Sequence, residues 1–392
     1  MEIRKTKNPE KEDIAMAVRT AIAAGHICID ITPVFPEGTK PVQNLGDLLK
    51  PGKLVEVAAS SVHTGGSVGN TGTAMKILGA DVKLLGKIGK DAFGGMIRQV
   101  LDRYGAGGDL METEGETSSY TIVLAVPGLD RLFVHCPGAN DTFSAADIPE
   151  DALESAALFH FGYPTLMRRM YENGGAELKA MFRHMKEKGI ATSLDLTVPD
   201  PAGDAGKADW KGILREVLPY TDFFVPSFEE LCFMLDREKY ERIGKTAGND
   251  EITKYVSLEA DIIPLAEACL ELGANAVLIK CGAPGMYLCC SGHMERVGQR
   301  LELDAAAWNG YRAFEKSFRI DRVLSATGAG DTSIAAFLTS ILKGSGPKEA
   351  LENASAEGAL CCTSYDSVSR LLPLEEVRKR IEAGWEKTEV NL

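Results

Sequence analysis

Short apolar segments alternate with amphipathic helical segments through the middle of this chain, and this alternation restricts the folds open to it. We expect strands and helices, in chain order, at 157–161, 177–188, 191–196, 222–225, 263–272 and 276–280. Such an alternation places parallel strands in one sheet with helices on both of its faces. The sequence therefore predicts a three-layer α/β/α sandwich with a mostly parallel central sheet, in which ligands bind at the carboxyl ends of the strands.

Two segments do not follow this alternation. Residues 34–61 and 119–136 read as extended chain with turn residues, and the second contains a hairpin pattern around a turn at 127–130. We expect residues 1–24 to form an additional surface helix and residues 25–392 to form the α/β domain.

The composition excludes several classes of function. The chain has 392 residues and a net charge of −13 without an evident cluster of Lys and Arg, so a nucleic-acid partner is not expected. No apolar run reaches the length of a membrane span, and residues 1–12 mix both charges unlike a signal peptide, so we expect a cytoplasmic protein that does not bind membranes. The glycine motifs of dinucleotide-binding and P-loop enzymes are absent, and no Cys-x-x-Cys suggests zinc.

Residues 325–332, Ser-Ala-Thr-Gly-Ala-Gly-Asp-Thr, precede apolar residues at helical spacing, so the glycine turn lies at the amino end of a buried helix. There the backbone N–H groups of Gly328, Ala329 and Gly330 can bind an anion that approaches closely. Asp331 stands at the same place, where a carboxylate suits the removal of a proton from an attacking hydroxyl. On its own, this octet is also compatible with an ordinary helix cap.

A second glycine-rich segment lies far upstream, at residues 63–80. It contains Gly65, Gly66 and Asn70, and the motif Gly-x-x-Gly-x-Asp follows at 86–91. Together with the late Gly-Ala-Gly-Asp, this order of motifs resembles the ribokinase-like (PfkB) family of carbohydrate kinases. The resemblance implies the ribokinase-like sandwich with a small β-sheet lid over the sugar, formed by about 31–63 and 119–137, through which a homodimer could form.

The resemblance also assigns residues to the acceptor side of the site. In the family an Asp near the end of the first strand binds sugar hydroxyls, and Asp30 occupies that place. Gly65, Gly66 and Asn70 carry over as further sugar contacts, and Asn140, where the lid returns to the core, is assigned to the same side. The chemistry is suitable, because Asp and Asn side chains can fix adjacent hydroxyls while glycines let a sugar lie against the backbone.

The family's Asn-x-x-Glu motif, whose Glu helps to hold magnesium, corresponds here to Ser227 to Glu230. The Asn is therefore replaced by Ser227, while the Glu is retained by spacing. A serine cap followed by acidic residues in the first turn of a helix explains the segment equally well without any metal.

Further positions correspond to the family's nucleotide side. Gly282 and Gly285 match the loop over the ATP phosphates, Lys280 could add a phosphate contact, and Asn353 sits where the family often has an Asn near the adenine ring. Ser325 replaces an Asp that relatives use in a monovalent-cation site, so activation by such a cation is left open. The aromatic insertion at 294–320 is expected to pack near the nucleotide.

Taken together, the motifs predict a kinase that transfers the γ-phosphoryl group of ATP, with Mg2+, to a hydroxyl of a sugar or sugar derivative, with Asp331 as general base. Two alternatives stay open: a nucleoside kinase of the same superfamily, and a non-catalytic protein that binds sugar or nucleotide as a regulator. Which acceptor is used cannot be derived from these residues.

Overall fold

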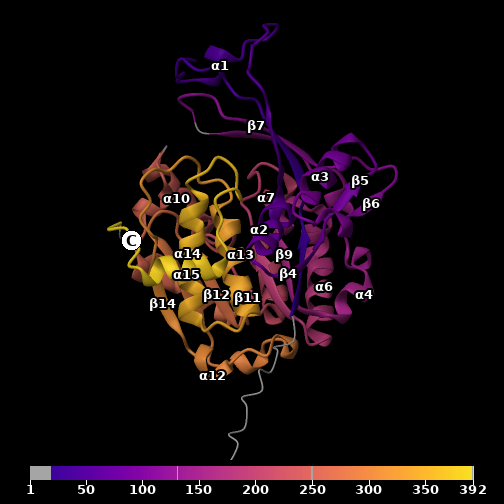
Figure 1. Cartoon of the computed structure of the whole chain (residues 1–392), viewed down its shortest axis with the longest axis vertical. Helices are drawn as coiled ribbons and strands as arrows, with labels where there is room; N and C mark the ends of the chain where they lie inside the picture. Colours follow the sequence, from indigo (N-terminus) through magenta and orange to yellow (C-terminus); the bar gives the residue numbers. More distant parts are fainter. Residues whose placement is uncertain (1–18, 130, 249, 391) are drawn as a thin grey trace, which may run out of the picture.

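The computed structural model describes residues 19–129, 131–248, 250–390 and 392. The strands of its central sheet lie in the order β14 (Arg312–Lys316), β13 (Gly285–Cys290), β12 (Ala276–Lys280), β11 (Phe223–Phe224), β10 (Ala191–Asp195), β9 (Ala156–Gly162), β1 (Thr20–Gly25) and β4 (Asp81–Leu85) (Figure 1). From β12 to β4 neighbouring strands pair in parallel, whereas β13 and β14 are antiparallel additions at one edge. The predicted fold class is confirmed, and β12 has the predicted bounds.

The expectation of a surface helix over residues 1–24 was wrong where it can be compared. Residues 1–18 lie outside the described part of the chain, and Thr20–Gly25 forms β1, a fully buried strand between β9 and β4. Its side chains alternate between the two faces, because Ile22 packs into one apolar cluster while Ala21 and Ala23 pack into the other. Small side chains suit a strand covered on both faces.

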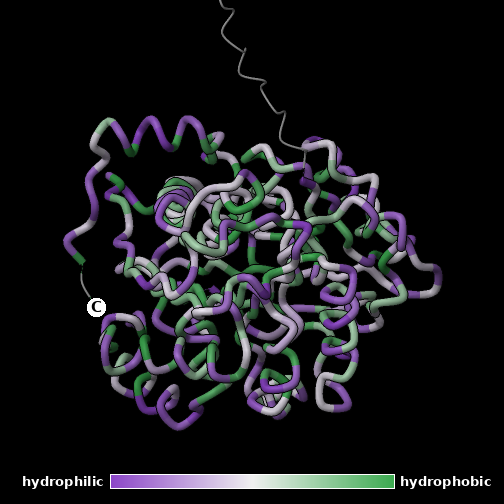
Figure 2. The backbone as a smooth tube through the Cα atoms, turned by 90° about the horizontal axis from the view of Figure 1, so that it is seen from below, coloured by the Kyte–Doolittle hydropathy of each residue, from purple (hydrophilic) through white to green (hydrophobic). Residues whose placement is uncertain are grey.

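Helices cover both faces of the sheet, as expected. One face packs against α2 (Thr73–Ile77), α3 (Ala92–Asp102), α13 (Ala329–Leu342) and α14 (Pro347–Cys361). The other packs against α4 (Glu150–Glu154), α6 (Ala176–Glu187), α8 (Trp210–Val217), α9 (Phe228–Leu235) and α11 (Ile263–Glu271). Figure 2 shows the more hydrophobic stretches toward the middle of the molecule and many hydrophilic ones at its periphery. Among the described residues, no helix is long and apolar enough to cross a bilayer.

Two smaller sheets complete the strand pairing. Four strands form a second sheet in the order β3 (Ser61–Gly65), β2 (Cys28–Thr32), β7 (Tyr120–Leu124) and β8 (Leu132–Cys136). β7 and β8 lie within the second segment expected to form a lid, whereas β2 and β3 overlap only the two ends of the first, 31–63. Figure 1 shows that the chain around α1 (Leu45–Leu48) extends from this sheet away from the sandwich. The third sheet pairs β5 (Lys87–Gly89) with β6 (Met111–Thr113).

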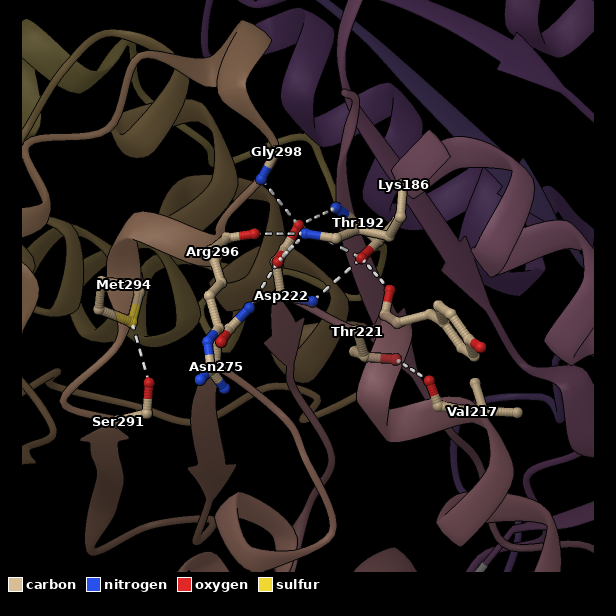
Figure 3. Close-up of polar contacts among 11 residues, drawn as sticks. Lys186, Thr192, Val217, Thr221, Asp222, Asn275, Ser291, Met294, Arg296 and Gly298 are labelled. Carbon is tan, nitrogen blue, oxygen red and sulfur yellow. Dashed lines mark hydrogen bonds and ion pairs between the residues drawn. The ribbon is translucent and has the colours of Figure 1, made fainter. Parts of the chain in front are cut away.

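A buried carboxylate ties several segments together at the amino ends of the parallel strands (Figure 3). Asp222, just before β11, accepts hydrogen bonds from Lys186 Nζ at 2.6 Å and from Asn275 Nδ2 at 2.7 Å. It also accepts bonds from the backbone N–H groups of Thr192 and Gly298. One carboxylate thus joins α6, the starts of β10 and β12, and the segment after β13.

Most of the 294–320 insertion does not lie near the predicted nucleotide site, where we expected it. Its first part, which includes α12 (Ala305–Trp308), lies at the end of the molecule opposite α1 (Figure 1). Trp308 packs on Phe223 and Phe337 in the core. Only the end of the insertion, from Ser317, lines the cavity described below. The aromatic residues before it are explained by core packing and not by nucleotide contact.

Candidate active site

Four neighbouring strands deliver polar side chains to one edge of the sheet. Tyr163 follows β9, Asp195 ends β10, Ser227 begins the helix after β11, and Lys280 ends β12. Because these strands are parallel, their carboxyl ends meet at the same edge. The amino end of α13 lies there too, since Gly330 and Asp331 line one cavity with all four residues. The predicted convergence of the strand ends on one site is therefore observed.

The turn before α13 has the geometry that its glycines predicted. Gly328 has a left-handed backbone, with φ 78°, and a Cβ added to it would overlap the side chain of Ser367. Only glycine fits such a position without strain. From Asp331 to Leu342 every residue of α13 is buried, so the helix is firmly held behind the turn. The Ala329 N–H bonds the Ala326 carbonyl at 3.3 Å, and the other N–H groups of the first turn offer a site for an anion.

Asp331 is buried, with 5% of its surface exposed, and it is held by three side chains from distant segments. Asn70 Nδ2 donates to one carboxylate oxygen at 3.2 Å and Thr71 Oγ1 to the other at 3.1 Å. The Tyr163 hydroxyl lies 2.8 Å and 2.9 Å from the two oxygens. The upstream glycine segment and the late motif thus meet directly at this carboxylate. Burial raises the pKa of Asp331, and these donors and the nearby Lys280 charge partly oppose that shift.

Asp30 and the glycine pair lie together, as the resemblance implied. A Cβ on Gly65 would overlap the Asp30 carboxylate, and one on Gly66, with φ +80°, would overlap the His26 ring. Burial raises the pKa of Asp30, and the charge of Asp331 adds to that shift. Glycine is therefore needed at both positions for the strands to close around these side chains.

The two asparagines assigned to the acceptor side have other partners. Asn70 donates to Asp331, and its carbonyl accepts a bond from the Ser367 hydroxyl at 3.0 Å. Asn140 is fully buried and bonds the backbone of Ile27 and Pro137 through three hydrogen bonds. Asn70 therefore lies beside the predicted base, whereas Asn140 holds the connection between β1 and β2.

Ser227 and Glu230 form a reciprocal cap at the start of α9. Ser227 Oγ accepts a bond from the Glu230 N–H at 3.2 Å, and Glu230 Oε2 accepts one from the Ser227 N–H at 2.6 Å. Burial raises the pKa of Glu230. The serine thus works as an ordinary helix cap where the family has an Asn, while the Glu230 carboxylate still lines the cavity.

Lys280 brings a positive charge to the helix mouth. Its Nζ lies 2.8 Å from Asp195 Oδ1, and a Cβ added to Gly330 would lie 3.6 Å from that nitrogen. Burial disfavours the Lys280 charge, but the Asp195 and Glu230 carboxylates outweigh it, so the pKa of Lys280 is raised. The lysine is therefore held protonated beside the backbone that would bind an anion.

A cavity of about 520 Å³ extends from this charged edge between α9, α13 and α14. Gly282 and Gly285 line it, together with Phe318, Ser355 and Gly358. Asn353 does not, because it is buried in the helix pair, where its Nδ2 donates to Ser340 Oγ at 3.0 Å. The face of α14 toward the cavity is thus formed by Ser355, Gly358 and Ala359.

Sequence reasoning missed four side chains of this site. Thr71 and Tyr163 contact Asp331, and Asp195 contacts Lys280. His26 lies with its Nε2 3.3 Å from Nε2 of His135 on β8, so the second sheet touches the core here. Position alone could have indicated Tyr163 and Asp195, because both stand at the carboxyl ends of expected parallel strands.

Comparisons with known proteins identify the family to which this chain is similar. The model of the pfkB family carbohydrate kinases matches residues 27–373. Fructokinase-1 of Oryza sativa is 26% identical over 349 residues, covering 84% of this chain and 92% of the relative.

Solved structures show the same fold. The fructokinase of Xylella fastidiosa with bound ATP aligns with a TM-score of 0.68 at 18% identity, covering 94% of this chain and 99% of its own. Arabidopsis thaliana ribokinase complexed with ribose and ATP aligns with a TM-score of 0.66 at 19% identity, covering 93% and 98%. Because the family model spans most of the sequence, this chain belongs to the pfkB family of carbohydrate kinases, which are phosphotransferases with an alcohol group as acceptor.

Proposed function

We propose that this protein transfers the γ-phosphoryl group of ATP to a hydroxyl of an uncharged sugar, with Asp331 as the general base. The observation that carries the proposal is the meeting of the two motifs at one carboxylate: Asn70 and Thr71 bind Asp331, and Asp331 borders the cavity at the mouth of α13. A hydroxyl placed there would lie between a proton acceptor and an anion site, which is the arrangement that phosphoryl transfer needs.

The charges on the acceptor side favour an uncharged sugar. Asp30 and Asp331 are carboxylates, and they would repel an acidic acceptor. Burial lowers the pKa of His26 and of His135, so these rings offer no compensating charge at neutral pH. Arg168 does not supply a free positive charge for an acidic acceptor either, because it lies within 4 Å of Asp141 and Glu172. In this proposal Asp30, Gly65, Gly66 and Asn70 bind and orient the acceptor, while Asn140 supports the backbone.

The residues on the donor side suit ATP. The first turn of α13 supplies N–H groups, Lys280 supplies a positive charge, and the cavity beyond them offers about 520 Å³. Bound ATP with magnesium supplies the phosphoryl group and screens its charge. Glu230 would hold the magnesium shell, and the N–H groups of Gly328, Ala329 and Gly330 stabilise negative charge on the transferring group.

Turnover measurements test this proposal. Release of ADP is measured with a panel of hexoses, pentoses, sugar acids and nucleosides, and neutral sugars are expected to be the substrates. In Asp331→Asn, kcat should fall roughly 10²- to 10⁴-fold with sugar affinity nearly unchanged. Asp321→Asn, at an exposed position, serves as the control. Full turnover in Asp331→Asn would refute the assigned role.

The same panel separates the two alternatives. Turnover with nucleosides alone would make the protein a nucleoside kinase. Binding of sugar or ATP without turnover of any acceptor would make it a regulator. The complete Gly328–Asp331 turn and the side-chain contacts to Asp331 support catalysis over regulation.

We also propose that the four-stranded sheet makes a homodimer. Its edge strand β8 exposes Leu132, Phe133 and Val134, with 42%, 59% and 55% of their surfaces accessible. Adjacent apolar side chains on an edge strand are a common site for pairing between chains. Light scattering after gel filtration should give twice the chain mass, and Phe133→Asp should give a monomer.

A further inference from the structure

Tyr163 has an unusual backbone conformation for its residue type. Among the described residues only three that are not glycine have positive φ, and Tyr163, with φ 64° and ψ 43°, is the bulkiest of them. The left-handed conformation is unfavourable for a residue with a Cβ, and residues held in it cluster at functional sites. Its backbone is fixed there by bonds between its N–H and the Asp195 carbonyl, and between its carbonyl and the Leu166 N–H.

This backbone directs the ring toward the base. The Tyr163 hydroxyl lies 2.8 Å from Asp331 Oδ1 and 2.9 Å from Oδ2, whereas Thr71 and Asn70 each reach one oxygen at a longer distance. A single hydroxyl proton placed between the two oxygens can bond either of them, and both distances are short. Of the three side-chain donors, this hydroxyl therefore makes the closest contact with the Asp331 carboxylate in the described site.

We propose that Tyr163 is a positioning residue for phosphoryl transfer: its hydroxyl orients the Asp331 carboxylate toward the acceptor and favours its ionised form. This inference rests on the proposed function of Asp331. Tyr163 acts through the base and is not assigned a contact with the sugar.

The electrostatic surroundings make such a donor necessary. Burial raises the pKa of Asp331, and the nearby carboxylates of Asp30, Asp195 and Glu230 disfavour a further negative charge. Of the groups that lower the pKa of Asp331, the Tyr163 hydroxyl is the strongest, ahead of Lys280, Thr71 and Asn70. Burial raises the pKa of the Cys361 thiol on α14, and the Asp331 charge adds to that rise.

Tyr163 itself remains a proton donor over the working range of pH. Burial raises the pKa of its hydroxyl well above the ordinary value, and the Asp331 charge raises it further. Without this hydroxyl the pKa of Asp331 rises, so the pH below which the base becomes protonated moves upward.

The test compares Tyr163→Phe with Tyr287→Phe, which removes a hydroxyl from another buried tyrosine on β13. In Tyr163→Phe, kcat at neutral pH should fall about tenfold, the effect of one lost hydrogen bond to a charged group, while KM for the sugar changes less than about twofold. The acid limb of kcat against pH, measured between about pH 5 and about pH 9, should move upward, with partial recovery at high pH. Tyr287→Phe should match the wild type.

Thr71→Val gives a second measurement that keeps the ring and backbone at position 163 unchanged. It removes one weaker donor to Asp331, so the acid limb should move in the same direction by a smaller amount. Circular dichroism and thermal unfolding establish that each variant is folded before kinetics are measured.

Two outcomes would overturn the inference. The first is a Tyr163→Phe variant with wild-type kcat and an unshifted acid limb. The second is an equal loss of kcat at every pH together with lower thermal stability, because that result would indicate a structural role only. The proposed function fails separately: if Asp331→Asn keeps wild-type turnover, Asp331 is not the base whatever Tyr163→Phe does. If Asp331→Asn is inactive and Tyr163→Phe behaves as wild type, only the role of Tyr163 fails.

Discussion

The two ends of the parallel strands hold buried carboxylates in opposite electrostatic settings. At the amino ends, Asp222 is met by Lys186, by Asn275 and by two backbone N–H groups. At the carboxyl ends, Asp331 receives only neutral donors, and other carboxylates share one lysine with it. A fully paired carboxylate fixes the fold, whereas a crowded one has a shifted pKa and is suited to proton transfer.

Breaking the amino end should have the largest effect on stability. In Asp222→Asn, the half-buried Lys186 loses its buried counter-charge, so the free energy of unfolding should fall by about 3 kcal/mol. Urea unfolding measures the loss. The kcat of the folded variant at low temperature should equal that of the wild type, because Asp222 does not reach the cavity. A fall in kcat without loss of stability would contradict the contrast between the two ends.

Removing the lysine at the carboxyl ends should mainly affect catalysis. In Lys280→Met, Asp195 and Glu230 lose their shared positive neighbour, and the proposed phosphate site loses its charge. We expect kcat/KM for ATP to fall about 10²-fold. Steady-state kinetics with varied ATP measures it, with Lys211→Met on the exposed side of α8 as the control. Unchanged ATP kinetics would show that Lys280 does not contribute to the binding of ATP.

A third buried carboxyl sharpens the comparison because no side chain of the described residues pairs with it. Glu357 on α14 is fully buried, and burial raises its pKa to about 8, although the Leu372 backbone partly opposes that rise. The folded state therefore binds a proton that the unfolded state releases near its ordinary pKa of about 4.5.

Stability should consequently decline as the pH rises from about 4.5 to about 8, and change little above that through this group. Glu357→Gln should remove the decline and raise the free energy of unfolding at pH 8 by on the order of 2 kcal/mol. Thermal unfolding across this range measures both effects. An unchanged pH dependence in the variant would show that Glu357 is not the group responsible.

The smallest effect is expected where the second sheet touches the core. In His135→Ala, the contact with His26 is lost, so KM for the sugar should rise about threefold with little change in kcat, the effect of one neutral hydrogen bond. Kinetics with varied sugar measures this change, and the exposed His293→Ala is the control. A loss of kcat as large as that in Tyr163→Phe would contradict this expectation and indicate that His135 also helps to position Asp331.

The sequence allowed prediction of what is encoded in contiguous residues. The strands around β9 to β12 have apolar runs of the correct length, and the Gly328–Asp331 turn is a single motif. By contrast β1 was mistaken for a helix, because the Ala-rich segment at 20–25 has high local helix propensity and only its burial on both faces makes it a strand.

The missed site residues depend on contacts between distant segments. Tyr163 meets Asp331 across 168 positions, and its role depends on a left-handed backbone that no motif encodes. Asn140 and Asn353 were assigned by their places in the family pattern, yet their amides bond the Ile27 backbone and Ser340. An amide in a sequence does not reveal whether a ligand or the protein itself will satisfy it.

The connection between the two main sheets is only two residues long. β1 ends at Gly25 and β2 begins at Cys28, so a fully buried strand of the central sheet continues almost directly into the strand that carries Asp30. A hinge at this connection would therefore act on a buried part of the chain and not on a surface loop. Occupancy of the acceptor site should accordingly slow amide hydrogen exchange in β1 as well as in the outer sheet.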